Sequence, residues 1–107
     1  MKKILFICSQ NKLRSPTAEA IFNEYDTLEV RSAGLNNDAE IRIGIDDIIW
    51  ADYIFVMEQT HKRKLRKRFS RYLKHQRVIC LGIRDEYDYM DEELVRLLKQ
   101  KVTQFLN

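Results

Sequence analysis

Residues 3–16 read Lys-Ile-Leu-Phe-Ile-Cys-Ser-Gln-Asn-Lys-Leu-Arg-Ser-Pro. The apolar run at residues 4–7 is typical of a buried strand. Ser15 is a good N-cap, and Pro16 suits the first position of a helix. The apolar face of that helix recurs at helical spacing in Ala18, Ile21, Phe22 and Tyr25. The stretch therefore predicts a strand, a short loop and a helix, in that order.

Cys8 and Arg14 lie at the two ends of the predicted loop. A loop that enters a helix N-terminus can converge its backbone N–H groups on one anion, and the helix dipole adds to their field. The same field favours a thiolate, so Cys8 is a candidate nucleophile near neutral pH. Arg14 offers a planar fork of donors that matches two phosphoryl oxygens. Such a pair also arises by chance, but ligands bind at this place in open α/β sheets, and the context predicts a phosphate-transfer site.

Residues 8–20, Cys-Ser-Gln-Asn-Lys-Leu-Arg-Ser-Pro-Thr-Ala-Glu-Ala, resemble the signature loop and first helix of the low-molecular-weight protein tyrosine phosphatases. The similarity continues in the same order at residues 31–34, 51–58 and 81–87. The resemblance implies a phosphomonoesterase with a cysteine nucleophile, a phosphocysteine intermediate, and no metal or other cofactor. It also implies that the substrate is a phosphorylated protein, with phosphotyrosine as the reacting group, or a small phosphomonoester.

The resemblance further implies roles for the loop and its neighbours. The residues expected to bind the phosphoryl group are Ser9, Gln10, Asn11, Lys12, Leu13 and Ser15. The Ser15 hydroxyl would donate to the Cys8 sulfur. Asn11 tolerates a left-handed backbone, and its side chain would tie the loop to Ser32. Tyr87 would line the mouth of the pocket, although a buried tyrosine explains that residue nearly as well.

The second catalytic group is expected to be a carboxylic acid. It would protonate the leaving oxygen as the phosphorus–oxygen bond breaks, and its carboxylate would then activate water. Loops that follow parallel strands leave the same edge of a sheet, so Asp85, shortly after the fourth predicted strand, can face Cys8. Asp85 also matches the acid of the family's Asp-Pro-Tyr motif, with Glu86 in place of the proline. Asp88 is the alternative acid, and a solvated acidic loop is the non-catalytic interpretation.

Strand and helix patterns alternate along the chain. Strands are predicted at residues 2–8, 28–32, 53–57 and 77–81, and helices at residues 16–25, 45–51, 60–73 and from a cap at Asp91 onwards. The alternation predicts a three-layer α/β fold, in which an open four-stranded parallel sheet has helices on both faces and the phosphate-binding loop follows the first strand. Residues 35–44 are shorter than the corresponding stretch of relatives, so the wall of the substrate pocket is expected to differ.

The length of 107 residues fits one globular domain with a modest core, and the resemblance implies that this single domain, residues 1–107, is phosphatase-like. Apolar residues make up 45% of the chain and charged residues 33%, as in ordinary soluble proteins. The apolar residues near the N-terminus stop too soon for a signal peptide, and no run reaches membrane-spanning length, so no membrane association is expected. Two cysteines without a framework of spacings, one of them needed as a thiolate, suit a reducing compartment, and we expect a cytoplasmic protein.

Cys80 lies in an apolar strand pattern and is most simply a core residue. Leu13 stands where many relatives carry a second cysteine, so Cys8 lacks a neighbour for a protective disulfide. Arsenate reduction on the same fold, in its thioredoxin-linked form, needs further cysteines on a mobile segment, which a cysteine in a strand cannot supply. An arsenate reductase served by a small external thiol stays as an alternative function.

Residues 61–77 contain nine Lys or Arg residues and no acid, whereas acids outnumber bases in the rest of the chain. Such a run is most often a solvated helix face. Its one-sidedness nevertheless predicts an anionic partner, either a nucleic acid, a polyanionic protein or a phosphorylated substrate. A phosphate- or polyanion-binding module without turnover is therefore the other alternative function, and turnover of p-nitrophenyl phosphate discriminates it from an enzyme.

Overall fold

The computed structural model describes residues 1–106. Its elements along the chain are β1 (Lys2–Cys8), α1 (Arg14–Phe22), β2 (Leu28–Gly34), α2 (Ile45–Trp50), β3 (Tyr53–Val56), α3 (Gln59–Phe69), the 3₁₀ helix η1 (Ser70–Tyr72), β4 (Arg77–Cys80) and α4 (Glu92–Thr103). No helix within residues 1–106 is both long enough and apolar enough to cross a bilayer.

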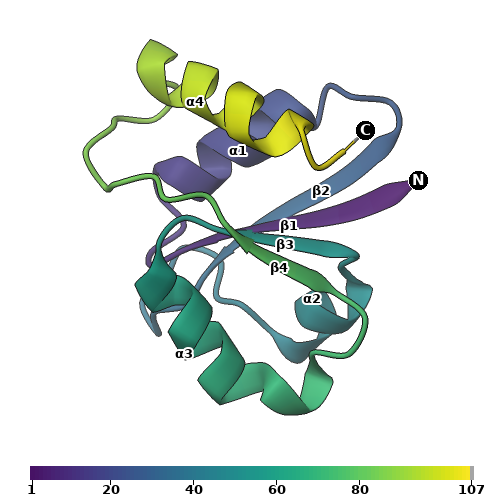
Figure 1. Cartoon of the computed structure of the whole chain (residues 1–107). Helices are drawn as coiled ribbons and strands as arrows, with labels where there is room; N and C mark the ends of the chain where they lie inside the picture. The colour runs from purple at the N-terminus through teal and green to yellow at the C-terminus, as the bar shows by residue number, and fades with distance from the viewer. Residues whose placement is uncertain (107) are drawn as a thin grey trace.

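The four strands form one parallel sheet in the order β2-β1-β3-β4. Helices α1 and α4 cover one face of the sheet, and α2 and α3 cover the other (Figure 1). This arrangement confirms the predicted three-layer α/β fold. All strands run in one direction, so the loops that follow β1, β3 and β4 leave the sheet at the same edge.

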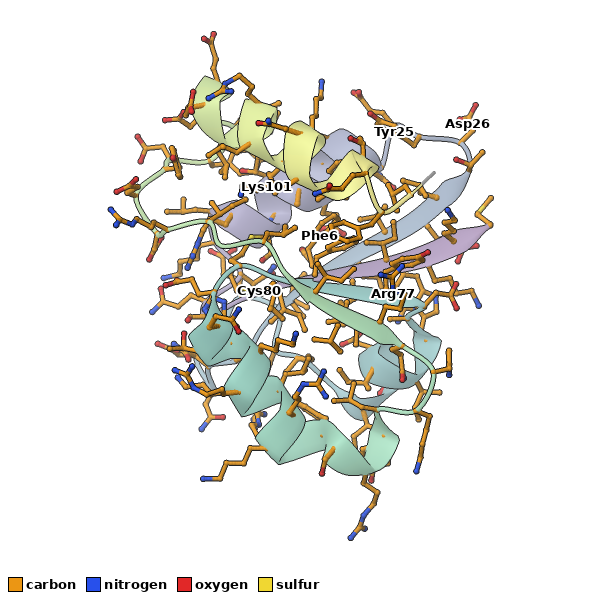
Figure 2. The ribbon with its side chains drawn as sticks, in the orientation of Figure 1. Phe6, Tyr25, Asp26, Arg77, Cys80 and Lys101 are labelled. Carbon is orange, nitrogen blue, oxygen red and sulfur yellow. The ribbon has the colours of Figure 1, made fainter. Side chains whose placement is uncertain are left out.

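Alternate residues of β1 enter the two halves of the core, as expected for a strand buried on both faces. Phe6 packs between Phe22 and Phe55 on the face of α1 and α4, with ring centroids 5.6 and 5.5 Å away (Figure 2). Leu5 and Ile7 enter the cluster on the opposite face, beneath α2 and α3. Because every residue from Ile4 to Cys8 is buried, the end of β1 is a rigid base for the loop that follows.

The start of α1 differs from the prediction. The helix begins at Arg14, with Leu13 at the N-cap and no side-chain cap, so Ser15 lies inside the first turn. Its hydroxyl is close to Cys8 and is not used as a cap. The helix also ends at Phe22, and Tyr25 beyond it is 40% exposed.

The predicted helix at residues 60–73 is divided into α3 and η1. The predicted cap of the last helix is confirmed, because the Asp91 side chain accepts a hydrogen bond from the Glu93 amide at 2.8 Å. The predicted ends of the other strands and helices lie within two residues of those observed.

Candidate active site

A loop of five residues joins the buried end of β1 to α1 and curls around the sulfur of Cys8. The Asn11 amide donates to Cys8 Sγ at 3.2 Å, and Ser15 Oγ lies 2.9 Å from the same sulfur. A cavity of about 270 Å³ opens over the loop, and it is lined by Cys8, Ser9, Gln10, Lys12, Leu13, Arg14 and Asp85. The structure thus brings most of the predicted site residues to one place.

The side chains of Asn11 and Ser15 organise the inner side of the loop. Asn11 has a left-handed backbone (φ 56°), and its Nδ2 donates to Ser15 Oγ at 3.0 Å. That bond occupies an acceptor site of the Ser15 hydroxyl and leaves its proton to be donated to Cys8 Sγ. The sulfur therefore receives two hydrogen bonds, from the Asn11 amide and from Ser15.

The prediction that the Asn11 side chain ties the loop to Ser32 is wrong, because Asn11 donates to Ser15. Ser32 Oγ instead donates to Glu19 Oε1 at 2.6 Å, which fastens β2 to α1. The loop is connected to β2 through backbone groups, since the Leu35 amide donates to the Cys8 carbonyl at 3.0 Å and the Asn36 amide to the Ser9 carbonyl at 2.9 Å.

Gly34, at the end of β2, lets the loop pack directly against the sheet edge. A Cβ atom there would lie 2.7 Å from the Ser9 carbonyl oxygen, 3.0 Å from the Asn11 nitrogen and 2.5 Å from Ala39 Cβ. The short segment at residues 35–44 folds back over this point, and the Glu40 amide donates to the Gln10 carbonyl at 3.0 Å. The segment thus supports the loop from outside.

Arg14 is buried and held along one edge of its guanidinium. Its Nη1 donates to Glu58 Oε2 at 2.7 Å and to the Ile83 carbonyl oxygen at 2.8 Å. Its Nε lies 3.7 Å from Asp85 Oδ1, across the cavity. Nη2 has no hydrogen-bond partner among residues 1–106, and Nε has only this longer contact with Asp85, so the Nε–Nη2 edge can donate to two oxygens of one anion. The hydrogen bond from Arg14 holds the pKa of Glu58 below its usual value, against the opposing effect of burial.

Glu58 and His61 are the two residues of the site that the sequence analysis missed. Both follow β3, whose end lies at the same sheet edge as Cys8, and this rule for parallel sheets could have identified them. By sequence, His61 begins a run of basic residues, which is the pattern of a charged helix face.

His61 is buried and makes a hydrogen bond through each ring nitrogen. Its Nδ1 accepts from the Glu58 amide at 3.1 Å, and its Nε2 lies 3.0 Å from Ser9 Oγ. Burial, and then the nearby charge of Arg14, lower the pKa of His61 to about 4. The ring is therefore neutral near pH 7, with its proton on Nε2. His61 then donates to Ser9 and leaves the Ser9 hydroxyl proton for the cavity.

The loop after β4 carries the predicted acid. The Ile83 amide donates to the Met57 carbonyl at 2.8 Å, which ties the start of this loop to the end of β3. Asp85 lines the cavity, whereas Asp88 is exposed and outside the lining residues. Tyr87 differs from expectation: it is half-buried against the core cluster of α1 and α4 and does not line the cavity.

Cys80 ends β4 and packs, half-buried, against the core cluster on the side of α2 and α3 (Figure 2). β3 lies between β4 and β1, so the two cysteines are about 10 Å apart across the sheet. Both are free thiols, and this spacing exceeds the reach of a disulfide. Within residues 1–106 there is no cluster of side chains suited to a metal ion.

Part of the chain matches a known protein family. Residues 3–46 match the model of the family described as low molecular weight phosphotyrosine protein phosphatase. Comparison with curated protein sequences gives no significant match.

Solved structures with the same fold cover almost the whole chain. A YwlE mutant from Bacillus subtilis is 25% identical, with a TM-score of 0.76 and full coverage of both chains. The YwlE arginine phosphatase from Geobacillus stearothermophilus is 20% identical over 99% of this chain and 94% of its own, with a TM-score of 0.78. The low molecular weight protein tyrosine phosphatase SP-PTP from Streptococcus pyogenes is 21% identical over 99% and 91%, with a TM-score of 0.80.

Residues 3–46 thus resemble the low molecular weight phosphotyrosine protein phosphatases in sequence, and residues 1–106 share the fold of the solved structures. The matched stretch includes the cysteine at the end of β1, and together these findings indicate a cysteine-based phosphatase.

Proposed function

We propose that this phosphatase hydrolyses phosphomonoesters through a phosphocysteine on Cys8, with Arg14 as the phosphoryl-binding residue and Asp85 as the general acid. The observation that carries the proposal is the position of Cys8 Sγ. Cys8 lines the cavity together with Arg14 and Asp85, and its sulfur accepts hydrogen bonds from Asn11 and Ser15. A nucleophile, hydrogen-bond donors for the phosphoryl oxygens and an acid then surround one phosphoryl group.

The reaction has two steps. The Cys8 thiolate attacks phosphorus while the bond to the leaving oxygen breaks and Asp85 gives that oxygen its proton. The Asp85 carboxylate then takes a proton from water, whose oxygen attacks the phosphocysteine and releases phosphate and the thiolate. The loop amides, with Ser9 and Arg14, hold the three outer oxygens in both steps.

For the substrate we propose a phosphorylated protein, with phosphotyrosine as the reacting group, or a small phosphomonoester. Ser9, Gln10, Lys12 and Leu13 border the cavity beside Cys8, and none of its lining residues is aromatic. This polar border accepts a phosphoryl group without an aromatic stacking partner at its mouth. We also propose a cytoplasmic location, because a reducing compartment keeps Cys8 as a free thiol.

The anionic partner of residues 61–77 remains a proposal as well. The exposed cations of α3 and of the following turns support it. A binding module without turnover and an arsenate reductase are not favoured, since the matched family and solved structures are phosphatases.

Steady-state assays of the purified protein test the proposed function. We expect turnover of p-nitrophenyl phosphate without added metal, and inhibition by vanadate that competes with the substrate. Parallel assays with phosphotyrosine and phosphoarginine peptides of matched sequence then identify the reacting group. Phosphate binding without turnover of any of these three substrates would contradict the proposal.

A further inference from the structure

Two adjoining surface hollows lie between α2 on one side and the end of α3 with η1 on the other. One has a volume of about 420 Å³ and is lined on one side by Ile45 and on the other by residues 67–72. The second, of about 240 Å³, is lined by Ile49 and by residues of the segment 71–76. Arg71 and Tyr72 line both hollows, so the two adjoin each other, and together they are called here the α2–η1 groove.

The wall of the groove on α2 is apolar. Ile45 and Ile49 are one helical turn apart, so they share a face, and they are 43% and 58% exposed. Ile48, three residues after Ile45, is fully buried and holds the helix on the core. The apolar side of the helix is therefore wider than the part that residues 1–106 cover, and Ile45 and Ile49 lie at its exposed edge.

The opposite wall of the groove is basic. Lys67, Arg68, Arg71 and Lys74 line it, and no acidic residue lines either hollow. Within the part of the chain that the structure describes, none of these four forms an ion pair. Arg68 is fixed by a hydrogen bond to the Leu35 carbonyl at 2.6 Å, so its charge has a defined place.

We propose that the α2–η1 groove binds an acidic amphipathic segment of a partner protein. The apolar side chains of such a segment would fill the hollows against Ile45, Ile49 and Tyr72, and its carboxylates would face Lys67, Arg71 and Lys74. A nucleic acid would satisfy the cations but leave the isoleucines exposed. A lipid surface would meet the same charges without filling two concave hollows. The apolar and basic walls together therefore favour a peptide.

The groove lies apart from the phosphate cavity. The first turn of α3 contacts the phosphate-binding loop through His61, whereas the groove is at the other end of the same helix, about 12 to 15 Å away. A bound segment would thus leave the cavity open. The groove is a means of holding a partner while the cavity acts on a phosphoryl group.

Fluorescence polarisation with two labelled synthetic peptides tests this proposal. The first peptide has about five helical turns, with Glu on one face and Leu on the other. The second has Ser in place of every Leu. We expect the first peptide to bind at least about tenfold more tightly than the second, because burying one large aliphatic side chain is worth this factor. Ile49→Ser and Arg71→Gln should each weaken binding of the first peptide about tenfold or more.

Lys99→Gln, an exposed position on α4, is the matched control and should bind like the wild type. All three variants should retain wild-type turnover of p-nitrophenyl phosphate, which reports that they are folded. Equal binding of the two peptides, or no effect of Ile49→Ser in a folded variant, would overturn the proposal. Tighter binding of single-stranded RNA or of phosphatidylserine vesicles, sensitive to Arg71→Gln and insensitive to Ile49→Ser, would also overturn it in favour of that partner.

Discussion

The ion pair between Arg14 and Glu58 determines which edge of the guanidinium faces the phosphate cavity. Nη1 of Arg14 is 2.7 Å from Glu58 Oε2 and 2.8 Å from the Ile83 carbonyl oxygen. With Nη1 held on this side, an anion in the cavity would be bound by Nη2 and by Nε, which has only a 3.7 Å contact with Asp85 Oδ1. Glu58 comes from the end of β3 and Arg14 from the start of α1, so the sheet topology itself creates this orientation.

Glu58→Ala should therefore impair catalysis although Glu58 does not line the cavity. The guanidinium would lose its orienting partner, and we expect kcat/KM for p-nitrophenyl phosphate to fall by about tenfold to a hundredfold. Glu58→Gln should be milder, because its amide oxygen still accepts from Arg14. Asp47→Asn, which removes a partner of exposed Arg31, is the control and should leave the rate unchanged. A wild-type rate in Glu58→Ala would show that Arg14 is oriented without Glu58.

His61 should make the stability of the fold depend on pH below about 6.5. Its pKa is about 4 in the folded protein, against an ordinary histidine value of 6.5, so between these pH values the unfolded chain binds a proton that the folded chain does not. The free energy of unfolding should thus decrease as the pH falls through this window, by up to about 3 kcal/mol. Urea denaturation at a series of pH values measures the slope.

His61→Gln should flatten that slope, whereas His75→Gln should not, because His75 is exposed. The chain has only these two histidines, so the comparison is direct. The same slope in wild type and in His61→Gln would mean that another group is responsible for the pH dependence.

Asp85→Asn tests the assignment of the general acid. Phosphoryl transfer from poor leaving groups such as phosphotyrosine needs a proton as the bond breaks, and we expect a loss on the order of a hundredfold or more. Activated aryl phosphates should lose less in the same step. Asp88→Asn should be mild, because Asp88 is outside the cavity lining. The reverse order of the two variants, measured by presteady-state kinetics, would assign the acid to Asp88.

Gly34→Ala should distort the phosphate-binding loop where the loop packs against the end of β2. The new methyl group would overlap backbone atoms of Ser9 and Asn11, which cannot move away as a flexible side chain can. We expect a loss of stability of about 1 to 3 kcal/mol and weaker vanadate inhibition. Gly44→Ala is the matched control, since its methyl group meets only ordinary contacts at 3.4 Å or more. Unchanged vanadate inhibition in Gly34→Ala would indicate that the loop does not depend on this contact.

The fold was predictable because its signals are local. The apolar run before Cys8, the helical stripe after it and the Asp91 cap lie within a few residues of the features they predict. The phosphate-binding loop was predictable for the same reason, since its cysteine, arginine and left-handed Asn11 are all within one short stretch.

The contacts that hold the loop in place join residues far apart in sequence, and local pattern could not reveal them. Ser15 has the residue type of an N-cap, but the sulfur of Cys8 competes for its hydroxyl. Ser32 has two possible partners, and Glu19 on the neighbouring helix is the one it contacts. By sequence, His61 belongs to a charged helix, and only the packing of that helix in the fold brings it into contact with Ser9.

Cys8→Ser gives the most direct test of the proposed mechanism. The loop amides and Arg14 remain in this variant, so it should still bind phosphate or vanadate, as measured by calorimetry. Its turnover of p-nitrophenyl phosphate should fall to the background rate, because a serine hydroxyl is a far weaker nucleophile than a thiolate in this site. A Cys8→Ser enzyme that binds phosphate and turns over substrate at the wild-type rate would contradict nucleophilic catalysis by Cys8.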